Sequence, residues 1–306
     1  MQRPSRGLVY MLFAALAFSV MGPLVKAVAP HIPAGESVFA RALGGLGLSY
    51  WMVKRAGVSP WGRDRRLLLL RGVFGTISLI AYFEALTKLP LADATAIMYT
   101  NPIWTAFLAR RVQREPLSPR VLGASLASLV GVVLIARPSF LFGAGDVALP
   151  LVPVLLALLA AFGSAAAYVT VREVSKTDHP LVIVFWFTLV ALPASVPGLA
   201  AAPVWPTAGE WLGLAGVAIS VQVGQVFLTR SLELEPAGRA TSVSYVQVVF
   251  AFLWGVLVFG EALRAEAVAG ATLIVASALL VALTPPARSV LTPEARPSTN
   301  ASASGD

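Results

Sequence analysis

The residues of this chain that could do chemistry are charged side chains that interrupt apolar stretches. Arg41, Glu84 and Asp93 each lie within or at the edge of such a stretch. A charged side chain at the bilayer centre is unfavourable by about 2.5–3.5 kcal/mol, so it normally faces a cavity, a partner or the interface. Arg41 is therefore a candidate for binding a solute. The alternative is that its long side chain snorkels to the interface.

The two carboxylates have separate interpretations. Glu84 lies at a depth similar to that of Arg41, so the sequence predicts either a static ion pair or a carboxyl group that binds a proton or an organic cation. Asp93 follows Pro90 at the start of a predicted helix, where the helix dipole favours negative charge. We expect Asp93 to serve mainly as a first-turn charge. Both carboxylates are candidates for ion coupling.

A second group of candidates is polar and aromatic and lies inside other apolar stretches. Amides in hydrocarbon need hydrogen-bond partners, and a cavity lined by amides and rings suits a flat or zwitterionic organic solute. The alternative is hydrogen bonding that only holds helices together. Besides Arg41, the candidates for substrate binding are Tyr99, Asn101, Trp104, Gln222, Gln225, Tyr245 and Gln247.

Several kinds of chemistry are excluded by composition. The chain has no cysteine and only two histidines, His31 and His179, and each lies beside a proline. Disulfides, thiolate chemistry and zinc knuckles therefore have no ligands here. The sequence contains no Walker motif and no Ser/His/Asp set. We expect no metal, no cofactor, no catalytic residues and no enzymatic activity.

The elements that carry these residues are predicted to be membrane-spanning helices. Hydrophobic residues make up 57% of the 306 residues and charged residues 12%, whereas a soluble domain carries about 25% charged residues. The composition indicates an all-α polytopic protein in a lipid bilayer. A spanning helix needs about 20 mostly apolar residues. Ten such stretches occur, at 7–28, 35–53, 67–88, 92–110, 119–136, 150–171, 181–201, 210–229, 239–259 and 264–284.

The basic residues fall mostly on one side of these spans. With the N-terminus placed in the cytoplasm, 18 of the 23 Lys and Arg residues, Arg71 among them, lie on the cytoplasmic side and 3 lie outside. Cytoplasmic loops collect Lys and Arg, so this split predicts cytoplasmic termini in a bacterial inner membrane. It also accounts for the net charge of +8 without nucleic acid. Lys26 and Arg172 are interpreted as interface anchors. Residues 285–306 are predicted to be a disordered cytoplasmic tail.

The chain repeats itself at a fixed offset of 146 residues. Matching pairs include Pro90 and Pro236, Tyr99 and Tyr245, and Glu115 and Glu261. Each repeat, 1–146 and 147–284, holds five predicted spans, so the second enters the membrane from the opposite face. Inverted repeats are typical of secondary transporters, which bind substrate near the midplane and work by alternating access. The alternatives are a membrane scaffold or lipid-handling protein without soluble-solute transport, and a membrane-embedded enzyme.

The residues around the first repeat's fourth span also resemble a known family. The segment Leu91-Ala92-Asp93-Ala94-Thr95 is followed by Asn101-Pro102-Ile103-Trp104 and then by Glu115-Pro116. This pattern resembles the EamA family of the drug/metabolite transporter superfamily, nearest to its solute carrier 35G-like and bacterial metabolite-uptake branch. The resemblance implies ten helices in two inverted repeats and transport of a small organic solute, proton-coupled or by exchange. The second repeat lacks a counterpart of Asp93, so ion coupling need not be symmetric.

One stripe of small residues bears on assembly. Gly123, Ala127 and Gly131 recur every four residues in one predicted span. Small residues let helices approach closely in membranes. The stripe therefore fits either internal packing or the face of a homodimer.

Overall fold

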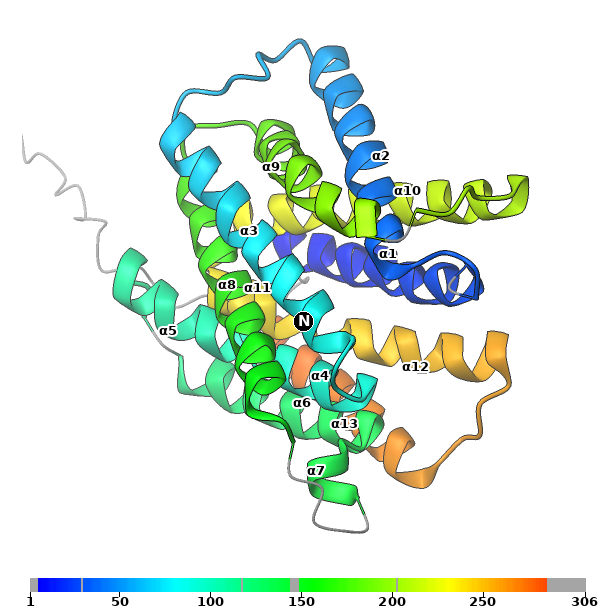
Figure 1. The fold of residues 1–306 in the computed structure, drawn as a ribbon. Coiled ribbons are helices and arrows are strands. Elements are labelled where there is room, and N and C mark those ends of the chain that lie inside the picture. The colour runs from blue at the N-terminus through cyan, green and yellow to red at the C-terminus, as the bar shows by residue number, and fades with distance from the viewer. Residues whose placement is uncertain (1–4, 29, 117, 144–148, 202, 285–306) are drawn as a thin grey trace, which may run out of the picture.

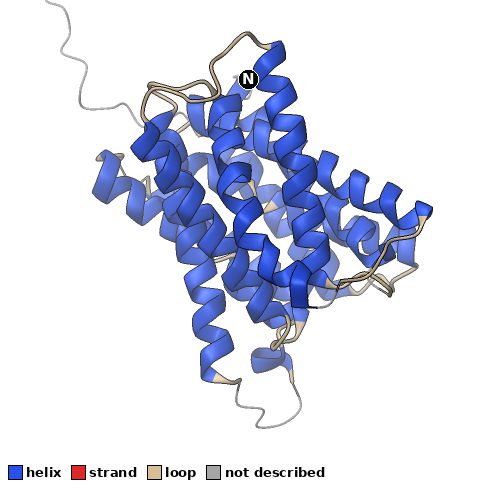
Figure 2. Ribbon diagram, turned by 45° about the horizontal axis from the view of Figure 1, so that its top comes forward, coloured by secondary structure: helices blue, strands red, loops and turns tan. Residues whose placement is uncertain are grey.

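A computed structural model describes residues 5–28, 30–116, 118–143, 149–201 and 203–284, and within these ranges every regular element is a helix (Figures 1 and 2). The predicted tail at 285–306 lies outside the described residues. The helices are α1 Arg6–Val28, α2 Ala34–Arg55, α3 Arg65–Leu86, α4 Leu91–Met98, α5 Asn101–Gln113, α6 Pro119–Ala136, α7 Ser139–Phe142, α8 Leu151–Val174, α9 Pro180–Ala201, α10 Ala208–Leu234, α11 Ala237–Val243, α12 Val246–Phe259 and α13 Ala265–Leu283.

Eight segments of the described chain are long and apolar enough to cross a membrane. The prediction of an all-helical multi-pass membrane protein is therefore confirmed. Helix α2, which carries Glu36 and Arg41, and the interrupted pair α4–α5 fall outside that set of eight. Helix α7, a single turn, was not predicted.

Two of the predicted spans are broken near their middle. The first break separates α4 from α5 at Tyr99 and Thr100, and the second separates α11 from α12 at Ser244 and Tyr245. Pro102 explains the first break, because its nitrogen has no hydrogen to donate to the preceding turn. The second repeat has no proline at the equivalent position. There the chain turns with a tighter bond, from the N–H of Gln247 to the carbonyl of Ser244 (3.0 Å).

The helices pack in equivalent pairs. We call two residues or helices counterparts when they are 146 positions apart. Helix α1 packs on α10, and their counterparts α8 and α3 pack together in the same way; α2 packs on α9 and α6 on α13, each helix against its own counterpart. Figure 1 shows these pairs side by side although their members are far apart in sequence. The tertiary structure thus carries the same duplication as the sequence.

The stripe of small residues packs at least partly inside the molecule. A Cβ atom on Gly131 would lie 2.6 Å from the carbonyl oxygen of Gly270, so α6 and α13 approach closely there. A Cβ atom on Gly123 would meet nothing within 4 Å. Internal packing is therefore the correct interpretation at Gly131.

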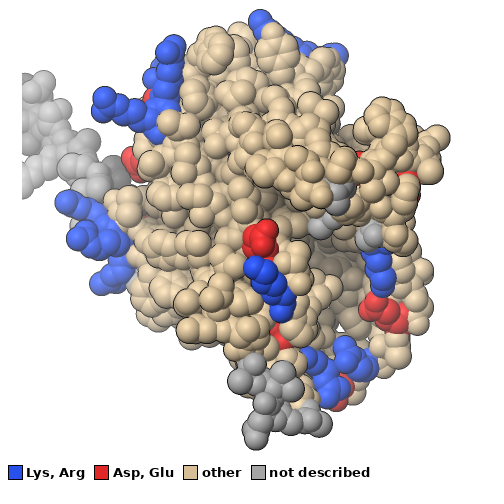
Figure 3. All heavy atoms as spheres, in the orientation of Figure 1, with Lys and Arg blue, Asp and Glu red and all other residues tan. Residues whose placement is uncertain are grey.

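The two ends of the helix bundle differ in how many basic side chains they carry. Figure 3 shows several groups of them over the ends of α2 and α5 and the start of α3, and a smaller number toward the other end. We call this end the basic end. The contact of Asp178, just before α9, with the backbone of Arg63 and Asp64 lies there. At the other end, which we call the opposite end, His31 after α1 meets Glu210 at the start of α10 (2.9 Å).

Candidate functional site

A polar cluster lies between α2, α3, α9 and α10. Arg41, Gln222 and Gln225 line one small cavity of about 10 Å³ together with Phe187 and Thr188. Three of the predicted substrate-binding residues therefore converge although they come from two helices far apart in sequence. Gln222 is only 3% exposed, and its Nε2 atom has no hydrogen-bond partner among the described residues.

Arg71, which was counted with the basic residues of the cytoplasmic side, is buried and belongs to this cluster. It lies on α3 and is 2% exposed. Its Nη2 donates to Gln225 Oε1 (3.1 Å), and its guanidinium carbon lies 4.4 Å from the ring centroid of Phe187. Gly75 leaves room for the guanidinium, because a Cβ atom there would collide with it. The sequence held the signal, since residue 71 falls inside the predicted span 67–88.

The two tyrosines at the helix breaks lie face to face. The rings of Tyr99 and Tyr245 have centroids 6.0 Å apart and are inclined by 28°. Tyr245 is fully buried, and its hydroxyl has no partner among the described residues. Asn101, also buried, has an unpartnered Oδ1 beside the first break. The counterpart residues Tyr99 and Tyr245 therefore pack against each other. For Gln247, partly buried on α12, the structure records no side-chain hydrogen bond.

Trp104 lies apart from these groups. It is 40% exposed and packs edge-on against Phe162, at a centroid distance of 5.9 Å. Phe162 continues a stripe of exposed residues on α8 that includes Leu155 and Leu159. A stripe at this spacing is one face of a helix, here the outward face. Trp104 therefore lies on the exposed surface of the helix bundle and does not line the polar cavity.

The two candidate carboxylates have partners other than Arg41. Glu84 lies 3.7 Å from Lys88, with both side chains about half exposed, and the expected ion pair with Arg41 is not formed. Glu84 also lines a cavity of about 200 Å³ between α3 and α9. Asp93 is fully buried in the first turn of α4, as expected, and accepts hydrogen bonds from the N–H and hydroxyl of Ser139 at the start of α7.

The strongest sign of function is a pair of equivalent ion pairs at the two ends of the bundle. At the basic end, Arg172 Nε lies 3.2 Å from Glu115 Oε1. At the opposite end their counterparts, Lys26 and Glu261, lie 3.2 Å apart. Lys26 and Arg172, which were interpreted as interface anchors, thus each tie one repeat to the other.

The same backbone device positions both carboxylates. Arg114 and its counterpart Gly260 end α5 and α12 in the left-handed conformation, with φ of 55° and 65°. The next residue then donates its N–H back to the last helical turn, from Glu115 to Ala109 and from Glu261 to Gly255. This left-handed helix end is a common C-terminal cap. It fixes where each glutamate leaves its helix.

The two ion pairs differ in what surrounds them. Arg172 also donates from Nη1 to the carbonyls of Leu232 (3.1 Å) and Glu233 (2.8 Å), and Glu115 Oε2 accepts the N–H of Ala237 (3.1 Å). Burial raises the pKa of Glu115, and Arg172 opposes that effect.

The pair at the opposite end is more exposed. The Lys26 and Glu261 side chains are 57% and 59% exposed, against 25% and 17% for Arg172 and Glu115. Lys26 instead lies over the ring of Phe259, at 3.8 Å. The structure records no bond from this pair to the counterparts of Leu232, Glu233 and Ala237.

Helix packing is also tighter at the basic end than at the opposite end. Helix α11 packs against α5 and α6, and α8 packs against α10. The equivalent pairs, α4 with α12, α4 with α13, and α1 with α3, make no comparable contact. The bundle is therefore closed at its basic end and open at its opposite end.

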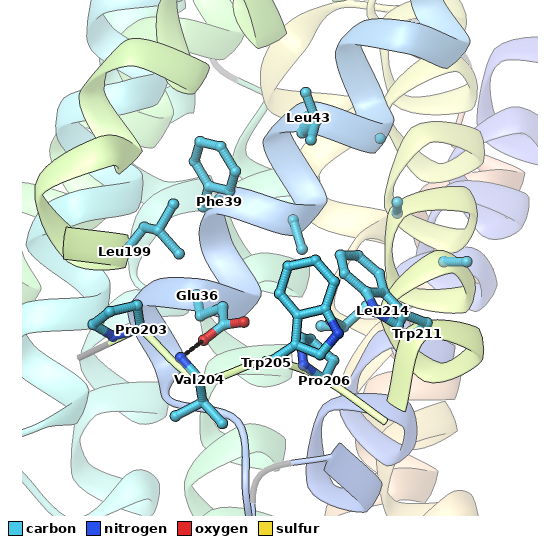
Figure 4. Close-up of a pocket in the computed structure, with 14 residues that line it drawn as sticks. Glu36, Phe39, Leu43, Leu199, Pro203, Val204, Trp205, Pro206, Trp211 and Leu214 are labelled. Carbon is cyan, nitrogen blue, oxygen red and sulfur yellow. Dashed lines mark hydrogen bonds between the residues drawn. The ribbon is translucent and has the colours of Figure 1, made fainter. Parts of the chain in front are cut away.

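A larger apolar cavity lies near the opposite end. It measures about 540 Å³ and is lined by α2, α10 and residues 203–206, with Phe39, Leu43 and Trp211 on its walls (Figure 4). Its one acidic group, Glu36, accepts the N–H of Val204 (3.0 Å). Ala218 borders both this cavity and the small polar one. The volume is in the range of ligand-binding pockets.

A family model described as the EamA-like transporter family matches residues 5–137 and again residues 151–283. The chain belongs to the EamA-like transporter family. The two copies begin 146 residues apart, which is the offset of the sequence repeat. The EamA two-repeat architecture and a multi-pass membrane transporter follow from this match together with the apolar helices.

Relatives of this EamA-like chain carry transporter names. It is 32% identical to the pseudopaline exporter CntI of Pseudomonas aeruginosa, over 91% of the chain and 96% of CntI. It is 31% identical to solute carrier family 35 member G1 of Homo sapiens, over 90% of the chain and 78% of that protein. A solved structure titled only as a crystal structure of a protein matches with a TM-score of 0.81 at 20% identity, over 90% of this chain and 96% of that one. That likeness shows the fold.

Proposed function

We propose that this EamA-like chain is a secondary transporter, not an enzyme, that moves a small organic metabolite by alternating access. The observation that carries the proposal is the unequal packing of equivalent helices, closed at the basic end and open at the opposite end. In an inverted-repeat protein, exchange of the two packings produces the conformation that is open to the other side. Each repeat can thus adopt the packing that the other repeat now has, which gives two conformations, one open to each side of the membrane.

The topology of the proposal has ten spans. Helix α2 and the pair α4–α5 cross the membrane as the eight more apolar segments do. The basic end faces the cytoplasm, because Lys and Arg collect on that side, and the membrane is the bacterial inner membrane. The described conformation is then closed to the cytoplasm and open to the outside.

The two counterpart ion pairs act as reciprocal locks. In the conformation open to the cytoplasm, the Arg172–Glu115 pair separates and the Lys26–Glu261 pair becomes buried. Lys26 then donates to the carbonyls of Leu86 and Thr87, the counterparts of Leu232 and Glu233. Glu261 accepts the N–H of Leu91, the counterpart of Ala237.

The solute binds where the predicted residues converge. Arg41, Gln222 and Gln225 contact it from one side, and Tyr99 and Tyr245 form the floor at the helix breaks. Asn101 and Gln247 flank those tyrosines, and Trp104 takes no part. Glu84 is the candidate for proton coupling, because both carboxylate oxygens of Asp93 are engaged in holding α7. Transport driven by exchange needs no coupling carboxylate.

The natural absence of cysteine makes a direct test straightforward. Spin labels on Val112→Cys and Leu234→Cys report the basic end, and labels on their counterparts, Val258→Cys and Lys88→Cys, report the opposite end. In lipid nanodiscs we expect two label-to-label distances at each end, one short (closed) and one long (open). A molecule with the short distance at one end should have the long distance at the other. A single distance at each end, unchanged by pH or by metabolite mixtures, would overturn alternating access.

A lipid-handling protein is the second candidate, and the apolar cavity of about 540 Å³ favours it. Its walls, with Phe39, Leu43 and Trp211, suit an acyl chain. Proteoliposomes separate the two functions. A transporter gives saturable flux of a soluble metabolite, whereas a lipid-handling protein gives bilayer-dependent movement of a labelled lipid and no such flux.

A further inference from the structure

The polar cluster contains cations without anions. Arg71 is almost completely buried and Arg41 partly buried, both at membrane depth. Arg71 has one amide and one aromatic ring as its partners, and the structure records no hydrogen bond or ion pair for Arg41 among the described residues. Buried cations in membranes normally pair with an opposite charge. Here the counter-charge has to come from elsewhere.

The acidic residues on the four helices around the cluster are all engaged at helix ends. Glu36 on α2 accepts the N–H of Val204, and Glu84 on α3 faces Lys88. On α10, Glu210 belongs to the Thr207 capping box, and Glu233 faces Arg230. Helix α9 carries no acidic residue. No carboxylate of these four helices therefore neutralises Arg41 or Arg71.

The unpartnered polar atoms of the cluster are mainly donors. Arg71 Nε and Gln222 Nε2 are buried without partners among the described residues. Arg71 can only donate, so its bond to Gln225 Oε1 turns the amide NH₂ of Gln225 away from it. Gln225 lines the small cavity. The small cavity is thus lined by hydrogen-bond donors, from Arg41, Gln222 and Gln225. No carboxylate of the four surrounding helices accepts from them.

We infer that this cluster binds a carboxylate or similar anionic group of the transported solute, which makes the substrate an organic anion. Arg41, Gln222 and Gln225 contact the anion, and Arg71 is a positioning residue that orients Gln225 and adds positive potential. The solute's apolar part extends into the cavity of about 540 Å³, which adjoins the cluster at Ala218. The small cavity, about 10 Å³, widens as the anion enters. This inference rests on the proposed transport function.

The test is a thermal-shift measurement on the purified full-length protein with matched probes. Succinate and phenylsuccinate carry carboxylates, succinamide is neutral, and 1,4-diaminobutane is cationic, all at equal ionic strength. Because a ligand that binds the folded state raises the Tm, we expect the dicarboxylates to raise it by about 3 °C or more and the other probes to leave it unchanged. A shift with the diamine or the amide alone, or no shift with either dicarboxylate, overturns the inference.

Two variants and a control tie the shift to the cluster. Arg41→Gln removes a donor and a charge, and the dicarboxylate shift is lost. Arg55→Gln, an exposed arginine on the same helix that lies over Trp51, keeps it. Gln225→Glu supplies an internal carboxylate to Arg71, so the protein's own Tm rises while the dicarboxylate shift disappears. A full shift in both Arg41→Gln and Gln225→Glu would place the anion elsewhere and overturn the inference.

Flux measurements on the same proteoliposomes keep the two proposals apart. If labelled succinate or phenylsuccinate binds but shows no saturable flux, the transport function fails while the anion site stands. If the diamine is transported and the dicarboxylates neither bind nor cross, the anion site fails while the transport function stands.

Discussion

The basic end and the opposite end of this transporter are built from equivalent residues and differ in their packing. Arg172 and Glu115 are mostly buried and hold three backbone groups of the other helices, while Lys26 and Glu261 are mostly exposed and hold none of the equivalent groups. Hydrogen bonds to a partly buried ion pair contribute more to stability than an exposed pair does. Equivalent ion pairs thus stabilise the closed basic end strongly and the opposite end weakly, because their surroundings differ.

The largest effect is expected for Arg172→Ala. The change removes the ion pair, removes two bonds to carbonyls and leaves the Glu115 carboxylate mostly buried without its cation. We expect the closed conformation of the basic end to be destabilised by about 2 kcal/mol relative to the open one, which lowers its population ratio roughly 30-fold. The spin-label distance between residues 112 and 234 should lengthen. An unchanged distance would show that helix packing alone closes this end.

Gly238→Val should have the next largest effect. A Cβ atom on Gly238 would lie 3.1 Å from Ala106 Cβ, so the added side chain wedges α11 away from α5. Overpacking of this kind is unfavourable by about 1–2 kcal/mol here. We expect the basic end to open. Ala92→Val, the counterpart change on partly exposed α4, is the matched control and should leave the distances as they are.

Glu115→Gln should remove a pH dependence. Burial raises the pKa of Glu115 in the closed conformation, while Arg172, Lys176 and the N–H of Ala237 oppose the rise. When this end opens and Glu115 is solvated, its pKa returns to the ordinary range. The closed conformation therefore binds the proton more tightly, and closure is favoured as pH falls and is lost as pH rises through the raised pKa.

The spin-label distance at the basic end, followed between pH 4 and 8, checks this sign. The wild type should show more of the closed population at low pH, and Glu115→Gln should show a flat profile. A closed population that grows with rising pH would mean that the ionised pair with Arg172 dominates over burial.

Lys26→Ala should have the smallest effect on the described conformation. Exposed ion pairs contribute about 0–1 kcal/mol, so we expect no change in Tm and none in the distance between residues 88 and 258. Under conditions that favour opening to the cytoplasm, the same variant should reduce the population of that conformation. The double variant Lys26→Ala with Arg172→Ala should then lie between the two single variants.

Much of the architecture could be predicted from the sequence. The all-helical multi-pass architecture, the two repeats 146 residues apart and the membership of the EamA family were predicted and are found. Arg71 was missed as a member of the polar cluster because it was counted only with the basic residues of the cytoplasmic side. The ion pair between Arg41 and Glu84, one of the two alternatives for Glu84, is not formed, because equal depth does not make two side chains face each other.

The sequence by itself determined that this chain is an apolar, duplicated helical protein, since composition and a constant offset do not depend on how the helices pack. It also made Glu115 equivalent to Glu261 and Arg172 equivalent to Lys26. The tertiary structure alone decided that one of these pairs is buried and the other exposed, and that Arg41 and Arg71 share a cluster without a carboxylate. Such properties depend on which faces of distant helices meet. Because the two repeats carry equivalent residues, the repeat pattern alone cannot specify which end of the bundle is closed.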